Sequence, residues 1–196
     1  MNHELMLTYV YKWVESMKDA HACPEHKVIC FCNDHYHAHV SFYENLNIIE
    51  LSIQDKKTEE NLFYLHFELN DIKTARNNIL SFFEFLKGEI TIHQDVEINV
   101  APMKVLISCI AGFTSSYFAS MMQQVFCDHE QNVQVDAMSI YNIDDVKEDY
   151  DVILIAPQIS YLYPQLKEKY GQKVMMIEAM DFATGNVQNT IHKIIA

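Results

Sequence analysis

The segment MKVLISCIAGFTSS, residues 103–116, combines an apolar run, a cysteine and a hydroxyl-rich stretch. The apolar run Met103–Ser108 has the length and composition of a buried strand. From about Thr114 to Cys127 the spacing of apolar residues favours a helix. Cys109 is therefore expected where a strand ends and a helix begins, which is where parallel α/β sheets bind their ligands.

The alternation of strand and helix continues to the end of the chain. Further strands are expected at residues 133–138, 151–156 and 173–177, and further helices at residues 160–170 and 186–195. Strands and helices that alternate in this way require a parallel sheet that is covered on both faces. Residues 103–196 are therefore predicted to form an α/β domain with a four-stranded, parallel, doubly wound sheet.

The first half of the chain has a different periodicity. The pattern predicts a helix over residues 4–20, strands over 28–32, 36–43, 48–54 and 62–69, and a second helix from Asp71 to about Lys87, with Gly88 as its stop. This order predicts an α+β domain, residues 1–88, with an antiparallel meander and two helices. Residues 89–102 form a connector in which alternating apolar residues allow an extra strand, and Pro102 marks its end.

Composition and charge exclude several classes of partner. The chain of 196 residues has a formal net charge of −13. Residues 1–100 carry 8 Lys and Arg against 16 Asp and Glu, and residues 101–196 carry 6 against 11, so both halves are acidic. Nucleic acids and anionic lipids attract basic surfaces, so neither is an expected partner.

The sequence also points to a cytoplasmic protein. No apolar run reaches the roughly 18–20 residues of a membrane span, and the first residues lack the pattern of a signal peptide. The chain has 5 cysteines, an odd number that fits thiols in a reducing compartment better than a disulfide framework.

The segment that begins at Cys109 has three features that suit phosphate. A helix N-terminus favours the thiolate form of a cysteine and offers N–H groups to an anion. Gly112 allows the backbone to bend around the anion. The hydroxyls of Thr114, Ser115 and Ser116 can add hydrogen bonds to phosphate oxygens. Together these features suit a phosphate held covalently on sulfur, whereas the simplest alternative is a buried structural cysteine.

Two protein families place a cysteine at such a position. Low-molecular-weight tyrosine phosphatases have an arginine six residues after it, where this chain has Ser115, and its one arginine is Arg76 in the other half. The enzyme IIB proteins of the lactose/cellobiose class have a glycine three residues after the cysteine, then a hydroxyl-rich stretch without arginine. The sequence around Cys109 and Gly112 resembles the second family.

The resemblance extends over roughly residues 103–195. The family has Pro-Gln after its third strand and then a tyrosine, which correspond here to Pro157, Gln158 and Tyr161. Near its last strand the family has an Asp followed by an aromatic residue, as Asp181 is here. The Asn-Gly that commonly follows is reversed in this chain to Gly185-Asn186, so the correspondence is looser there.

This resemblance implies a phosphoryl carrier of a bacterial sugar phosphotransferase system, and thus a phosphotransferase. Cys109 would accept phosphate from a phosphohistidine of enzyme IIA and pass it to a sugar bound by the membrane enzyme IIC, without a cofactor or a metal. The segment after Cys109 would bind the phosphate through Ile110, Ala111, Gly112, Phe113, Thr114, Ser115 and Ser116. Supporting or partner-binding roles would fall to Pro157, Gln158, Tyr161 and Asp181.

A second group of chemically active residues lies in the first half. If Asn33-Asp34 is a two-residue turn, Cys32 lies opposite His35 and Cys30 opposite His37, and all four share one face of a hairpin. Zn²⁺ accepts this set of ligands. A polar sheet surface explains the same pattern, because structural zinc sites usually have Cys-x-x-Cys spacing.

Three functions therefore remain open from the sequence. The chain is a working transport component, or a non-transporting regulator that senses sugar flux through its enzyme IIB-like half, or a metal-binding or redox protein led by its first half. The sequence shows neither the sugar nor the role of residues 1–100.

Overall fold

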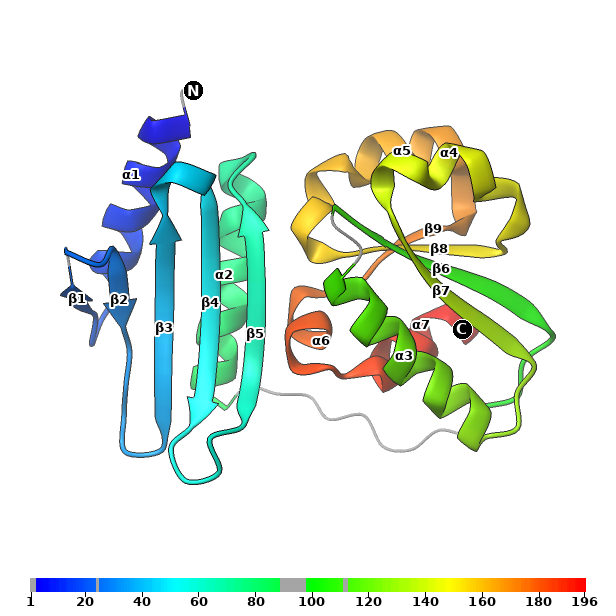
Figure 1. Ribbon diagram of the computed structural model, residues 1–196, viewed down its shortest axis with the longest axis horizontal. Helices are drawn as coiled ribbons and strands as arrows, with labels where there is room; N and C mark the ends of the chain where they lie inside the picture. The colour runs from blue at the N-terminus through cyan, green and yellow to red at the C-terminus, as the bar shows by residue number, and fades with distance from the viewer. Residues whose placement is uncertain (1–2, 24, 89–97, 111–112) are drawn as a thin grey trace. The chain divides into compact units, whose positions relative to one another are not determined.

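The computed structural model describes residues 3–23, 25–88, 98–110 and 113–196. The chain divides into two compact units, Met1–Ile90 and Thr91–Ala196 (Figure 1). The sequence pattern allows an extra strand in the connector; residues 89–97 of it lie outside the described residues, and residues 98–102 contain no strand.

The first unit is a five-stranded antiparallel sheet with a helix before it and a helix after it. Its elements are α1 (His3–Glu15), β1 (His21–Cys23), β2 (Val28–Cys30), β3 (Tyr36–Tyr43), β4 (Ile48–Asp55), β5 (Asn61–Glu68) and α2 (Ile72–Leu86). The strands follow one another in the order β1-β2-β3-β4-β5, so the predicted meander is confirmed. Strand β1 was not expected, because three residues are too few to show an alternating pattern.

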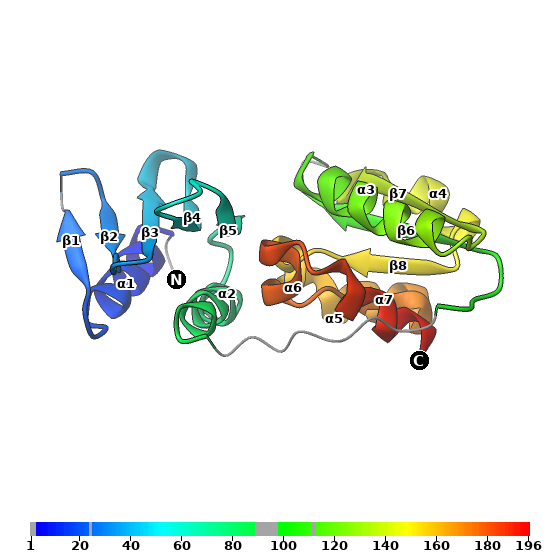
Figure 2. The same cartoon turned by 90° about the horizontal axis from the view of Figure 1, so that it is seen from below.

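Both helices of this unit cover the same face of the sheet (Figures 1 and 2). The strand residues that form the core align across the sheet: Ile29 pairs with Val40, Val40 with Leu51 and Leu51 with Leu65. All four side chains are fully buried. Asp71 caps α2 as predicted, because its side chain accepts a hydrogen bond of 2.8 Å from the N–H of Thr74.

The turn between β2 and β3 differs from the predicted one. The side chain of Asn33 accepts hydrogen bonds of 2.8 Å from the N–H groups of His35 and Tyr36. The N–H of Asn33 also donates to the carbonyl of Tyr36, so the turn is centred on Asp34-His35. The predicted pairing is therefore wrong by two residues, and Cys30 lies opposite His39 rather than His37.

The second unit is a parallel sheet with helices on both faces. Its strands β6 (Met103–Cys109), β7 (Val133–Ser139), β8 (Val152–Ile155) and β9 (Val174–Met176) lie in the order β7-β6-β8-β9, and all pairs are parallel. The longer helices are α3 (Phe113–Asp128), α5 (Tyr163–Tyr170) and α7 (Val187–Ile195). This architecture confirms the predicted four-stranded, doubly wound sheet.

Alternate residues of the strands of this sheet pack toward opposite layers. Leu106, Ile153 and Ile155 belong to the apolar cluster that includes Ile143 of α4 and Leu166 of α5. Figure 1 shows α4 and α5 along one face of the sheet, and α3, α6 and α7 along the other.

The connections between the strands of the second unit contain short helices that the sequence pattern does not predict. Between β7 and β8 lie η2 (Ile140–Asn142), α4 (Ile143–Val146) and η3 (Lys147–Asp149), and α6 (Ala179–Thr184) precedes α7. The helix predicted over residues 160–170 is divided into η4 (Pro157–Leu162) and α5. Pro164, which has no N–H group, lies in the first turn of α5 and suits the start of a new helix. No helix in the described part of the chain is both long and apolar enough to span a bilayer.

Candidate functional site

The candidate site lies at the carboxyl edge of the parallel sheet, around Cys109. Cys109 is the last residue of β6 and lies opposite Ser139, the last residue of β7. Helix α3 begins four residues later, at Phe113. The thiol is therefore at the strand end that precedes a helix, as predicted. The residue is only 3% exposed, so its sulfur lies almost out of contact with bulk solvent.

The hydroxyl of Ser115 contacts this sulfur directly. The distance between Cys109 Sγ and Ser115 Oγ is 2.9 Å, and Ser115 is fully buried. A hydroxyl can rotate its proton toward sulfur and so stabilise negative charge on it. Ser115 stands six residues after the cysteine, where the phosphatases have arginine, so a neutral hydroxyl occupies this position.

Two neighbouring strands hold the backbone on either side of Cys109. The hydroxyl of Ser139 donates a hydrogen bond of 2.7 Å to the carbonyl of Ile110. The N–H of Ala156 donates a hydrogen bond of 3.0 Å to the carbonyl of Ser108. The ends of β6, β7 and β8 are thus connected around the thiol. No motif marks Ser139 in the sequence, but counting from the first residues of the two strands, Met103 and Val133, places it opposite Cys109.

The comparisons with known proteins agree with this geometry. The family model "PTS system, Lactose/Cellobiose specific IIB subunit" matches residues 104–193. This region resembles a phosphotransferase-system IIB subunit. The match confirms the resemblance seen in the sequence around Cys109, and residues 103–196 are called the IIB-like domain below.

Two solved structures are similar to about half of the chain. The lactose-specific IIB component domain from Streptococcus pneumoniae has 20% sequence identity and a TM-score of 0.42, and the match covers 47% of this chain and 97% of that chain. The cellobiose-specific IIB component from Borrelia burgdorferi has 23% identity and a TM-score of 0.42, with 50% and 92% covered. The search of curated proteins gives no match.

The residues expected to bind phosphate are only partly described. Ala111 and Gly112 lie outside the described residues, and Phe113 and Thr114 are the first two residues of α3. The side chain of Ile110 packs against the apolar cluster beside α4 and α5. Of the hydroxyl residues with described side chains, Ser115 lies next to the sulfur.

Ser116 points in a different direction. It is exposed and lines a groove of about 350 Å³ between α3 and β7. The structure therefore brings Ser115 to the sulfur and places Ser116 at the surface.

The Pro-Gln pair and its tyrosine follow β8 at the same carboxyl edge of the IIB-like domain. Pro157 opens η4, and Pro157 and Gln158 are both buried. The Oε1 atom of Gln158 is buried and, within the part of the chain that the structure describes, has no hydrogen-bond partner. Tyr161 packs against the apolar cluster beside α4 and α5, so packing is one of its roles.

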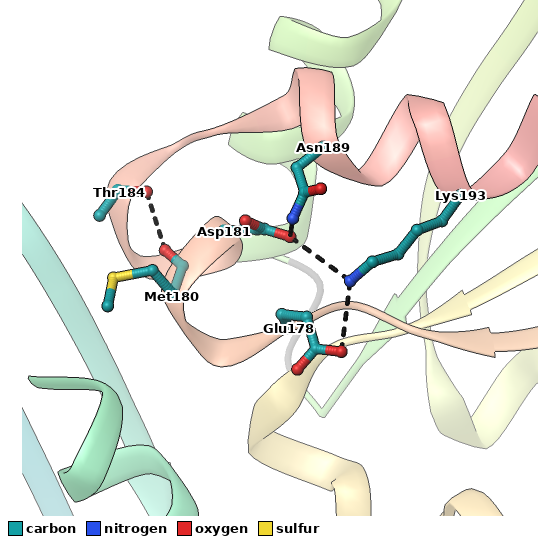
Figure 3. A network of polar contacts seen from close by, with 6 residues as sticks. All are labelled: Glu178, Met180, Asp181, Thr184, Asn189 and Lys193. Atoms are coloured by element: carbon teal, nitrogen blue, oxygen red, sulfur yellow. Dashed lines mark hydrogen bonds and ion pairs between the residues drawn. The ribbon is translucent and has the colours of Figure 1, made fainter. Parts of the chain in front are cut away.

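Asp181 forms a polar network that joins α6 to α7 (Figure 3). It is 3% exposed, and its Oδ2 accepts a hydrogen bond of 2.6 Å from the side-chain amide of Asn189. Lys193 Nζ lies 3.8 Å from the same oxygen and 3.2 Å from Oε1 of Glu178. Asp181 therefore has structural contacts within the domain. Asn189 and Lys193 are four residues apart, so they lie on the same face of α7 and can both reach Asp181.

The segment around Asp181 packs against α3, the helix that follows Cys109. The rings of Phe118 and Phe182 stack with centroids 5.2 Å apart. Gly185 has φ +71°, and a Cβ atom at this position would lie 3.0 Å from Cε of Met121. Glycine thus satisfies both the left-handed backbone and the close approach of α3. This explains why glycine precedes Asn186 here.

The four metal candidates of the first unit do not form the predicted arrangement. His35 lies in the turn, while Cys30, Cys32 and His37 lie on the sheet face that points away from the helices. Burial, followed by the charges of Cys32 and Cys23, raises the pKa of the Cys30 thiol. Among residues 3–23, 25–88, 98–110 and 113–196, no group of three or more His, Cys, Asp or Glu side chains is positioned to hold a metal ion.

Proposed function

We propose that the IIB-like domain carries a phosphoryl group on Cys109. It accepts this group from a phosphohistidine of an enzyme IIA protein and passes it to a sugar bound by a membrane enzyme IIC. The main support is the place of Cys109 at the end of β6 and before α3, with the hydroxyl of Ser115 2.9 Å from its sulfur. The family match over residues 104–193 supports the same role.

The first transfer is a substitution at phosphorus. The Cys109 thiol loses its proton, and its sulfur attacks the phosphorus of the phosphohistidine. The S–P bond forms as the P–N bond breaks, and the departing imidazole takes up a proton. The N–H groups in the first turn of α3 and the helix dipole stabilise the phosphate oxygens. Ser115 donates its hydrogen bond to the sulfur while that atom is anionic.

The second transfer regenerates the thiolate. A hydroxyl of the sugar attacks phosphorus, its proton is lost, and the S–P bond breaks. Between the two steps the phosphocysteine has to avoid hydrolysis. The low exposure of Cys109 limits contact with water, and Ser115 replaces the arginine with which phosphatases stabilise attack by water. Both features suit a cytoplasmic carrier better than a hydrolase.

The chain holds more than a carrier domain, which favours a regulatory function as the second candidate. The two similar IIB structures are covered over 97% and 92% of their lengths by about half of this chain. The first unit, with its own sheet and buried core, is therefore additional to a domain of complete size. We propose residues 1–88 as an attached module, joined by residues 89–102, which docks a partner or responds to the phosphorylation state of Cys109.

A phosphotransfer assay tests the carrier function. The full chain is incubated with labelled phosphoenolpyruvate, the general phosphotransferase proteins and a panel of enzyme IIA proteins. We expect one enzyme IIA to label the chain, with an acid-stable phosphate that mass spectrometry locates on the peptide containing Cys109. A chain that no enzyme IIA labels, or that carries phosphate on another peptide, would contradict the proposal.

Ser115→Ala is expected to slow the transfer without unfolding the domain. The substitution removes a hydrogen bond to a charged sulfur, worth about 1.5–3 kcal/mol, which corresponds to a roughly 10- to 100-fold slower labelling of Cys109. Ser115→Thr keeps the hydroxyl and is the matched control. The rate of labelling at a fixed concentration of enzyme IIA is the measurement, and it should fall in Ser115→Ala and be largely kept in Ser115→Thr. Equal labelling rates for the alanine and wild-type chains would show that the hydroxyl does not act on the sulfur.

A further inference from the structure

The solvent-facing side of α3 carries no charge, although the chain as a whole is acidic. Residues 105–127, which include every residue of α3 except the last, contain no Asp, Glu, Lys or Arg, whereas these four residue types make up 21% of the chain. Before the final residue of the helix, the exposed side chains described on α3 are Ser116, Tyr117, Ser120, Gln124 and Cys127. Their spacing places them in one stripe along the helix, which is called the uncharged face of α3 below.

The large apolar side chains that are exposed in the second unit lie near the carboxyl edge of its sheet. Among the side chains described there, they are Tyr117, Tyr141 and Met176. Tyr117 lies in the second turn of α3, Tyr141 follows the last residue of β7 by two residues, and Met176 is the last residue of β9. Tyr117 is 69% exposed and Tyr141 is 81% exposed. Exposed apolar side chains that gather in one region of a surface indicate a place where another molecule binds.

A groove between α3 and β7 continues this surface. β7 is the edge strand of the sheet, and α3 lies beside it (Figure 2). The groove has a volume of about 350 Å³, and its lining includes the small side chains of Ser120 and Ala137. The amide of Gln123 makes hydrogen bonds of 2.8 and 2.9 Å to the backbone of β7, which hold the two walls of the groove together. The charged residue in the lining is Asp136, whose carboxylate already accepts a hydrogen bond of 3.0 Å from Tyr150.

The proposed phosphoryl transfer requires a partner at this edge of the sheet. Cys109 is 3% exposed, so a phosphohistidine reaches its sulfur only when the donor protein contacts the residues around it. The first turns of α3 and the segment that leads from Ser139 to Tyr141 are next to Cys109 in the fold. Interfaces between proteins have few charged residues at their centre and are rich in tyrosine. The uncharged face of α3 and the two exposed tyrosines have this composition.

We propose that the enzyme IIA protein that phosphorylates Cys109 docks on the uncharged face of α3, with Tyr117 and Tyr141 as anchors and with side chains of its own in the groove beside β7. This inference rests on the proposed carrier function. It also specifies the kind of donor that the chain selects. A donor with charged residues at the centre of its docking surface would bury them without partners, which is costly, so the matching surface is apolar or carries neutral hydrogen-bonding groups.

The test is the rate at which phosphorylated enzyme IIA labels the full chain, measured over a range of enzyme IIA concentrations. Tyr117→Ala and Tyr141→Ala are each expected to raise the concentration that gives half of the maximal rate by roughly 5- to 30-fold, the effect of losing an interface anchor. The maximal rate should be kept, because neither substitution alters Cys109 or Ser115. Tyr9→Ala is the matched control, since it removes a tyrosine of the first unit that is 58% exposed, and it should be labelled as the wild type is.

A pair of variants at Ser120 tests the absence of charge. Ser120→Ala keeps a small neutral side chain on the uncharged face and should be labelled as the wild type is. Ser120→Glu places a carboxylate on the same face and should raise the half-saturating concentration of enzyme IIA by more than roughly 10-fold, because the carboxylate is buried without a partner.

The outcomes separate this inference from the carrier function. A wild-type chain that no enzyme IIA labels would overturn both. If the wild type is labelled, an unchanged concentration dependence in the two tyrosine variants, or equal behaviour of Ser120→Glu and Ser120→Ala, would overturn the docking surface alone. Normal labelling of the variants with slower transfer to a sugar in vesicles that contain enzyme IIC would assign the surface to the membrane acceptor instead, and a wild-type dimer that Ser120→Glu dissociates would assign it to a second copy of the chain.

Discussion

Cys109→Ser is expected to abolish labelling of the chain by every enzyme IIA protein that labels the wild type. A serine hydroxyl keeps its proton at neutral pH and is a much weaker nucleophile than the sulfur of a cysteine. The substitution also preserves the size of the side chain, so the contact with Ser115 can be kept as a hydroxyl–hydroxyl hydrogen bond. The measurement is the amount of acid-stable phosphate per chain after complete reaction of the wild type.

The control for this loss is a second cysteine of the same domain. Cys127 is exposed near the end of α3, and Cys127→Ser should be labelled at the wild-type rate. Thermal unfolding of Cys109→Ser establishes that the domain is folded. If a folded Cys109→Ser chain still accepts phosphate that is stable in acid, another residue is the acceptor, and the role assigned to the carboxyl edge of β6 is wrong.

The sequence predicted the architecture of both units because the longer strands have a clear pattern of apolar residues. Core strands such as β4 and β5 alternate, and the buried parallel strand β6 is mainly apolar, so their location follows from burial. Short helices and strands have too few residues to show such a pattern of apolar residues. Strand β1 has three residues, and α4 has four, so neither presents a repeat that a pattern can show.

The details of the candidate site were predicted less completely, because they depend on contacts between distant segments. The place of Cys109 follows from local pattern, since a strand, a cysteine and a helix start are adjacent in the sequence. The hydrogen bond from Ser139 and the contacts of Asp181 with Asn189 and Lys193 arise only when the strands and helices pack. The turn at Asn33 is a similar case, because one side chain that accepts two backbone hydrogen bonds decided the register.

The substitution with the largest expected effect on stability is Phe118→Ala. Phe118 is 1% exposed and stacks on Phe182, so it joins α3 to α6. Removing a buried phenylalanine side chain costs about 3–5 kcal/mol, which is a large part of the 5–15 kcal/mol by which a domain is typically stable. We expect the IIB-like domain to unfold at a much lower denaturant concentration and to lose phosphotransfer as α3 moves away from Cys109.

The single tryptophan of the chain allows this effect to be assigned to one unit. Trp13 lies in α1, so its fluorescence follows unfolding of the first unit, while circular dichroism follows both units. Phe118→Ala should lower the midpoint of one part of the dichroism transition and leave the fluorescence midpoint unchanged. Phe82→Ala is the matched control, because Phe82 is fully buried in the first unit and its loss should shift the fluorescence midpoint. A shift of both signals in Phe118→Ala would instead show that the two units unfold together, and the first unit would then be coupled to the domain that carries Cys109.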